Sequence, residues 1–175
     1  MVNARMTSKP DRSAQNLINA RTLIGRKVPG ILHDQYYFNG EKCLIGKGSI
    51  EWQLGEHGYL SMYLLSNGES VGADLLPLEP PISFDLESGD TCSWLREDLL
   101  QDLEASHLVN IAVEDVIGMV DTWPNQKGHL VGFKILFETG DFIIFLNQGD
   151  EEAVLLNELP PESDGITTTW VSRIE

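Results

Sequence analysis

The sequence is poor in basic residues and in long apolar runs. It has 12 Lys and Arg against 27 Asp and Glu, a net charge of −15. A chain this acidic repels the phosphates of nucleic acids and anionic lipid head groups, so we expect it to bind neither. Its longest apolar runs are about five residues, far short of the roughly 20 needed to cross a bilayer. We therefore expect a protein without membrane contact.

Cysteine is also scarce. Cys43 and Cys92 are the only two, and their spacing fits neither a Cys-x-x-Cys motif nor a Cys/His zinc motif. Both lie among apolar neighbours, so we interpret them as buried, reduced thiols; a single long-range disulfide is the alternative. The polar first 15 residues lack the apolar segment of a secretion signal. These features favour a cytoplasmic location.

Motifs that name a chemistry are missing as well. The four histidines fall in separate expected elements and form no His-x-His or His-Glu-x-x-His group: His33, His57, His107 and His129. There is no nucleophile elbow, phosphate-binding loop or dinucleotide fingerprint. The sequence therefore predicts no catalytic residue, no metal ligand and no cofactor.

What the chain does contain is strand periodicity. Apolar residues alternate over His129–Phe137, turn residues follow at Glu138–Asp141, and Phe142–Leu146 is wholly apolar. This hairpin is too apolar for a sheet edge, so we place it centrally. Asn39-Gly40 is a strong signal for a second hairpin. The strands expected elsewhere are Gln35–Phe38, Glu41–Ile45, Ile50–Leu54, Tyr59–Leu65, Ser70–Leu76, Ile82–Leu86, Val116–Trp123, Ala153–Asn157 and Ile166–Ile174.

Two segments favour helix. Asn16–Lys27 has apolar residues near helical spacing. Asp90–His107 is expected to be the main helix, because Leu95, Leu99 and Leu103 would share one face. The expected fold is α+β and predominantly β, an antiparallel curved sheet or sandwich with one main helix. We expect a flexible N-terminus over residues 1–13 and a single β-rich domain over residues 14–175.

The acidic charge is unevenly distributed. Residues 1–27 hold six basic groups and one acidic group, whereas the rest holds six basic and 26 acidic groups. We expect the basic side chains of the first helix to be solvated rather than folded onto the acidic body. Such a body attracts a basic protein partner. The candidate partner-binding residues are the acidic face of the main helix and the acids after the central hairpin: Glu97, Asp98, Asp102, Glu104, Asp150, Glu151 and Glu152.

The central hairpin also carries a resemblance. A strand ending at Phe137, a turn at Gly140, a second strand and the run Asn147-Gln148-Gly149-Asp150-Glu151 form its pattern. This pattern resembles a late hairpin in small immunity-type proteins that bacteria encode beside polymorphic toxins. The resemblance implies a bacterial cytoplasmic protein that binds and neutralises a toxin, and it assigns no functional residue.

Three functions are therefore expected in order. The first is an immunity-type inhibitor of a basic partner such as a cognate toxin. The alternative is a small enzyme or a carbohydrate- or small-ligand-binding domain with an aromatic-lined cleft, for which the tryptophans are candidates: Trp52, Trp94, Trp123 and Trp170. The third is a self-assembling structural protein.

Overall fold

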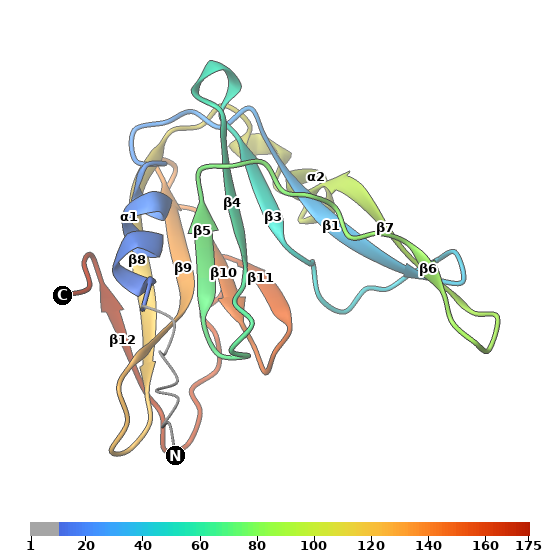
Figure 1. Ribbon diagram of the computed structural model, residues 1–175. Coiled ribbons are helices and arrows are strands. Elements are labelled where there is room, and N and C mark those ends of the chain that lie inside the picture. The colour runs from blue at the N-terminus through green and yellow to red at the C-terminus, as the bar shows by residue number, and fades with distance from the viewer. Residues whose placement is uncertain (1–10) are drawn as a thin grey trace, which may run out of the picture.

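The computed structural model describes residues 11–175 as two antiparallel β-sheets with short helices (Figure 1). This confirms an α+β fold that is predominantly β. The flexible N-terminus expected over residues 1–13 lies mostly outside the described residues. Of its last three residues, Asp11 is 2.5 Å from the Lys127 ammonium and Ser13 begins the first helix.

The first sheet has the order β5-β4-β3-β1-β7-β6, with β2 paired to the end of β1. Its strands are β1 (Gly30–Phe38), β2 (Glu41–Lys42), β3 (Ile50–Gln53), β4 (Tyr59–Leu64), β5 (Val71–Asp74), β6 (Phe84–Asp85) and β7 (Thr91–Asp98). Asn39 and Gly40 both have positive φ, 50° and 79°, as a tight two-residue hairpin turn requires. The predicted hairpin at this point is confirmed, although its second strand is shorter than expected.

The second sheet has the order β11-β10-β9-β8-β12. Its strands are β8 (Val113–Thr122), β9 (His129–Phe137), β10 (Phe142–Asn147), β11 (Glu152–Leu156) and β12 (Thr167–Val171). The pair β9 and β10 lies inside the sheet, as its apolar sequence predicted. Gly140 in the turn between them has φ of 88°, a value that favours glycine.

The two sheets share one core. Trp52 on β3 and Phe137 on β9 are fully buried and stack with ring centroids 6.4 Å apart. A smaller apolar cluster, which includes Met119, Val131 and Ile144, lies apart from this core. The connection from β11 to β12 passes beside this second cluster, where Pro160 and Pro161 line the same cavity as Met119 and Val131.

The helices are α1 (Ser13–Arg21) and α2 (Leu99–Asp102), with 3₁₀ turns η1 (Gly55–His57) and η2 (Ser106–Leu108). Helix α1 lies against β5, the edge of the first sheet, and against β8 of the second (Figure 1). Asn16 and Asn19 bond to the β5 backbone: Asn16 Nδ2 to Val71 O at 3.4 Å, Ala73 N to Asn16 Oδ1 at 3.3 Å, and Asn19 Nδ2 to Ala73 O at 2.7 Å. Within residues 11–175, no helix is long and apolar enough to cross a membrane.

The expected solvation of the first helix's basic side chains is wrong for Arg21, which contacts the acidic body, as does Arg12 just before the expected helix. Arg12 forms an ion pair with Asp74 at 2.8 Å, and Arg21 forms one with Asp115 at 3.2 Å. Both pairs are partly exposed, so each contributes little to stability. They fasten α1 to both sheets.

The main helix expected at Asp90–His107 is wrong. Residues 91–98 are strand β7, and only the four residues of α2 are α-helical. The leucine spacing is helical by coincidence, and pairing with β1 overrides it. Tyr36 and Trp94 are directly opposite in this pairing, with ring centroids 5.1 Å apart. Such a cross-strand aromatic pair stabilises a sheet.

The pairing of β1 with β7 extends beyond the sandwich. Figure 1 shows β6, β7 and the end of β1 projecting away from the second sheet, and we call residues 35–42 and 82–95 the arm. Large apolar side chains are exposed along the arm: Phe38, Ile82, Phe84, Leu86 and Leu95. Exposed apolar groups gathered on one feature are typical of an interaction surface.

Candidate functional site

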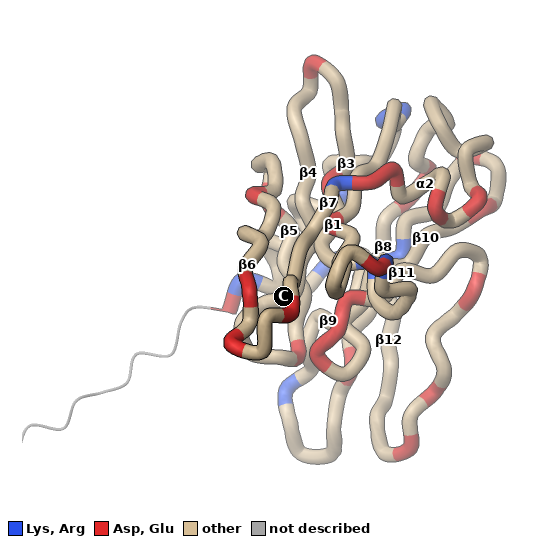
Figure 2. Tube along the Cα trace, turned by 90° about the vertical axis from the view of Figure 1, so that its right-hand side faces the viewer, with Lys and Arg blue, Asp and Glu red and all other residues tan. Residues whose placement is uncertain are grey.

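Charge covers the molecule unevenly. Figure 2 shows acidic positions along much of the trace and few basic ones. Each cation after residue 27 is already engaged within the molecule. Lys42, Lys47, Arg96, Lys127 and Arg173 contact carboxylates, and Lys134 lies over the rings of Phe142 and Trp170. Much of the acidic surface is therefore left without a compensating cation from this part of the chain.

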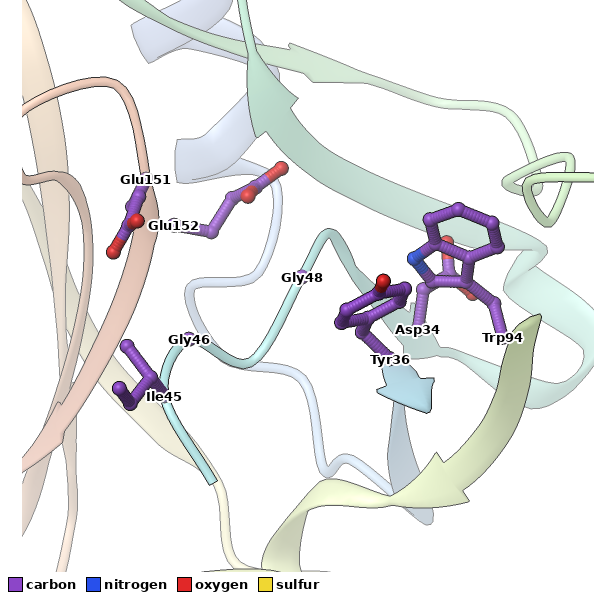
Figure 3. Close-up of a pocket in the computed structure, with 8 residues that line it drawn as sticks. All are labelled: Asp34, Tyr36, Ile45, Gly46, Gly48, Trp94, Glu151 and Glu152. Carbon is purple, nitrogen blue, oxygen red and sulfur yellow. The ribbon is translucent and has the colours of Figure 1, made fainter. Parts of the chain in front are cut away.

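One acidic surface borders a hollow of 190 Å³ at the base of the arm. Its lining residues are Asp34, Tyr36, Ile45, Gly46, Gly48, Trp94, Glu151 and Glu152. Figure 3 shows Asp34, Tyr36 and Trp94 on one side, Glu151 and Glu152 on the other, and residues 45–48 between them. Pockets for drug-sized ligands occupy about 300–1,000 Å³. This hollow is closer to the size of one side chain.

The first wall of the hollow is aromatic. The Tyr36 and Trp94 rings are in contact, and Phe84 continues the row with its centroid 5.9 Å from that of Trp94. The Tyr36 hydroxyl donates a hydrogen bond to Cys92 Sγ at 3.2 Å, and this bond raises the pKa of Tyr36 to about 12. Tyr36 is therefore neutral at ordinary pH, and the wall offers π faces to an apolar or cationic group.

Beneath this wall lies a buried charge cluster. The Arg96 guanidinium is 3.2 Å from an Asp34 oxygen and 3.0 Å from a Glu51 oxygen, and it donates to the Leu78 carbonyl at 2.6 Å. The Asp34 and Glu51 side chains are only 5% and 4% exposed. Burial raises the pKa of Asp34, Arg96 opposes that shift, and the Glu51 charge adds to it. With both carboxyls ionised, the cluster has one more negative than positive charge.

The second wall of the hollow is acidic. Glu151 ends the turn from β10 to β11 and Glu152 begins β11; this corner contacts the segment before β3. Lys47 N donates to Glu152 O at 3.3 Å, and Ser49 Oγ donates to Glu152 Oε1 at 3.4 Å. Glu151 and Glu152 form no ion pair with a Lys, Arg or His of residues 11–175. Both residues line the hollow; in Figure 3 the Glu152 side chain extends towards the aromatic wall, whereas the Glu151 carboxylate points away from it.

The other predicted partner-binding residues do not share a helix face. Glu97 is on β7, Asp98 caps α2 by accepting from Gln101 N at 3.0 Å, and Asp102 ends α2. Glu104 follows with φ of 54°. The expected acidic helix face is wrong because its helix does not form. Asp150 is exposed beside Glu151, so only the hairpin acids stay together as predicted.

Glu97 and Asp102 instead belong to an ion network. Lys42 Nζ is 2.5 Å from Glu97 and 3.0 Å from Asp102, and Lys47 also pairs with Asp102. Burial raises the pKa of both carboxyls, but hydrogen bonds from the lysines outweigh burial and hold each pKa below its ordinary value. His33 lies beside these two carboxylates. One ligand atom from each of His33, Glu97 and Asp102 lies within 4.8 Å of the other two.

No protein-family model, curated protein or solved structure matches this chain. Function must therefore be inferred from the chemistry of its surface.

The four tryptophans named for the alternative function do not line one common cleft, although Trp123 lines the cavity beside Pro160 and Pro161. Trp52 is in the core, Trp94 is in the hollow, Trp123 packs edge-on against His129, and Trp170 is partly exposed on β12. A site in the hollow can use only one of the four. The useful aromatic partner of Trp94 is Tyr36, which the sequence pattern did not single out.

Proposed function

We propose that this protein binds a basic protein partner through the hollow and the turn at Asp150–Glu152, as an immunity-type inhibitor binds a toxin. The observation that carries the proposal is the placement of Glu151 and Glu152. They have no ion-pair partner within residues 11–175, and they line the 190 Å³ hollow on the side opposite the Tyr36 and Trp94 rings (Figure 3).

A lysine or arginine side chain of the partner fits this chemistry. Its cationic end gains charge-assisted hydrogen bonds from the two glutamates. The flat face of an arginine guanidinium, or the aliphatic stem of a lysine, packs on the rings. A cation–π contact there contributes about 0.5–2 kcal/mol. Leu44 and Ile45 beside the hollow are 79% and 82% exposed, and they offer apolar area to the surrounding interface.

Net charge supports the same partner at longer range. A charge of −15 draws a basic protein towards the acidic surface and raises the association rate. A bacterial, cytoplasmic setting is part of the proposal. It is supported by the resemblance at residues 135–151 and by the thiols of Cys43 and Cys92, which are both free. The hollow itself gives little support to an enzyme or carbohydrate-binding function, because it is small and holds one tryptophan.

The test compares two double charge reversals. Basic proteins captured from source cells are identified, purified and measured by surface plasmon resonance against wild type, E151K/E152K and E162K/D164K. The control acids lie in the exposed connection between β11 and β12, away from the hollow lining. Both variants change net charge equally. E151K/E152K is expected to slow association by about tenfold or more at low salt, and the control by much less.

Salt provides the second criterion. The difference in association rate between the two variants should shrink at about 1 M salt, where the screening length is about 3 Å. Equal slowing by both variants would mean that only net charge matters. Unchanged association of E151K/E152K, with far-UV circular dichroism showing a native fold, would remove the hollow from the interface.

A further inference from the structure

A second feature, independent of the hollow, surrounds His33. This side chain on β1 is fully buried, and its Nδ1 is 2.8 Å from the backbone carbonyl oxygen of Lys47. A carbonyl can only accept, so Nδ1 must carry the proton of the neutral ring. Nε2 then presents a lone pair, and it has no hydrogen-bond partner among residues 11–175. A buried polar atom in this condition needs an explanation.

Two carboxylates lie near this nitrogen. Asp102 Oδ2 is 3.9 Å from His33 Nε2, too far for a direct hydrogen bond. Glu97 completes the group, and one ligand atom from each of the three residues lies within 4.8 Å of the others. Strand β1 supplies the imidazole, strand β7 one carboxylate and helix α2 the other. Three separate elements therefore converge on one point.

We propose that His33, Glu97 and Asp102 bind a divalent transition-metal ion such as Zn²⁺, for which Lys42 and Lys47 compete. An imidazole nitrogen and carboxylate oxygens suit zinc and related metals. Ca²⁺ and Mg²⁺ prefer oxygen ligands alone. A hydrogen bond from the other ring nitrogen to a backbone carbonyl is the usual support of a metal-binding histidine, and the Lys47 carbonyl supplies it.

Lys42 and Lys47 neutralise the negative charge of Glu97 and Asp102 when no metal ion is bound. Their two ammonium groups match the charge of one divalent cation and neutralise the same carboxylates. Lys42 and Lys47 side chains are 30% and 20% exposed, so both enter from the solvent side and can swing outwards. Neither ammonium satisfies His33 Nε2. Metal binding exchanges two flexible cations for one ion that also uses the imidazole.

The experiment is zinc titration of the chelator-treated full chain by isothermal calorimetry, with Mg²⁺ as the comparison ion. Wild type is expected to bind a single zinc and no magnesium at the same concentrations. H33N should weaken zinc binding by at least about a hundredfold, since even loss of a supporting residue costs 10–100-fold. H57N is the matched control, because His57 is exposed on η1 and should leave the affinity unchanged. K47M should tighten binding several-fold by removing a competing cation.

X-ray absorption of zinc-loaded wild type and K47M keeps the test decisive even if H33N fails to fold. The expected ligand shell has one imidazole nitrogen and oxygen atoms. Sulfur ligands would assign the zinc to Cys43 or Cys92 and overturn the proposal. It is also overturned if wild type binds no zinc below millimolar concentration, if folded H33N binds as tightly as wild type, or if K47M binds no tighter.

Discussion

Replacing Arg96 with Met removes the guanidinium that contacts two buried carboxylates, Asp34 and Glu51. Arg96 also donates to the Leu78 carbonyl, so the variant loses three hydrogen-bonding contacts. Removing one partner of a buried ion pair costs about 3–5 kcal/mol, because the remaining charge is left uncompensated. The Arg96 side chain is 24% exposed, so water can partly solvate the carboxylates that lose it and reduce this cost. We expect R96M to lose about 3 kcal/mol of unfolding free energy, or about 6–12 °C in Tm.

The loss should depend on pH. Burial already raises the pKa of Asp34 above its ordinary value of 3.8. A group whose pKa is raised by folding contributes its full stability below the unfolded pKa, and this contribution disappears as pH rises through the folded pKa. Without Arg96 the pKa of Asp34 rises further. The deficit of R96M relative to wild type should therefore be small near the ordinary pKa of an aspartate and grow towards neutral pH.

Urea denaturation followed by tryptophan fluorescence measures this difference at acidic and neutral pH. R173M is the matched control, because the Arg173 side chain is 82% exposed and its ion pair is with nearby Glu175. It should change the unfolding free energy by less than about 0.5 kcal/mol. The triple variant D34N/E51Q/R96M should recover most of the loss. A deficit below about 1 kcal/mol at neutral pH, or no recovery in the triple variant, would refute the charge argument.

Three further outcomes are expected. G48A should destabilise the fold by about 3 kcal/mol, because a Cβ there would lie 2.3 Å from the β1 backbone and φ is +66°. G165A is its control in the same denaturation assay: φ is +76° but the space around a Cβ is open, so the cost should be about 1 kcal/mol. In native protein a thiol reagent should modify half-buried Cys43 well before buried Cys92, and equal rates would contradict the burial. W52A should lose about 3–5 kcal/mol by calorimetry, because Trp52 is fully buried.

Local signals predicted the hairpins but not the long-range pairing. Asn39-Gly40 and Gly140 determine their turns within a few residues, and the apolar run of β10 requires an interior position. Strand β7 was missed because its leucines stand at helical spacing, while its true partner, β1, lies about 60 residues earlier. A single sequence does not show such a register, which tertiary contacts decide.

The candidate sites divide in the same way. Glu151 and Glu152 were found because they follow an apolar strand as a compact acidic run. Their aromatic neighbour Tyr36 was not found, and Trp94 was named only as one of four tryptophans, since the facing wall depends on how the arm leaves the sandwich. His33 gave no metal signal because Glu97 and Asp102 come from distant elements. Spacing rules detect ligand sets within one motif and cannot detect a set assembled by the fold.

The asparagines of α1 have a consequence for solubility during folding. Strand β5 is the edge of the first sheet, and Asn16 and Asn19 occupy its outward backbone groups as a neighbouring strand would. An uncovered edge is a template for pairing with another chain. Detachment of this nine-residue helix would expose that edge and, because Leu17 and Ala20 belong to the core, would open the core at the same time. Helix α1 therefore prevents a strand of another molecule from pairing with β5, and aggregation should begin at this edge when α1 detaches.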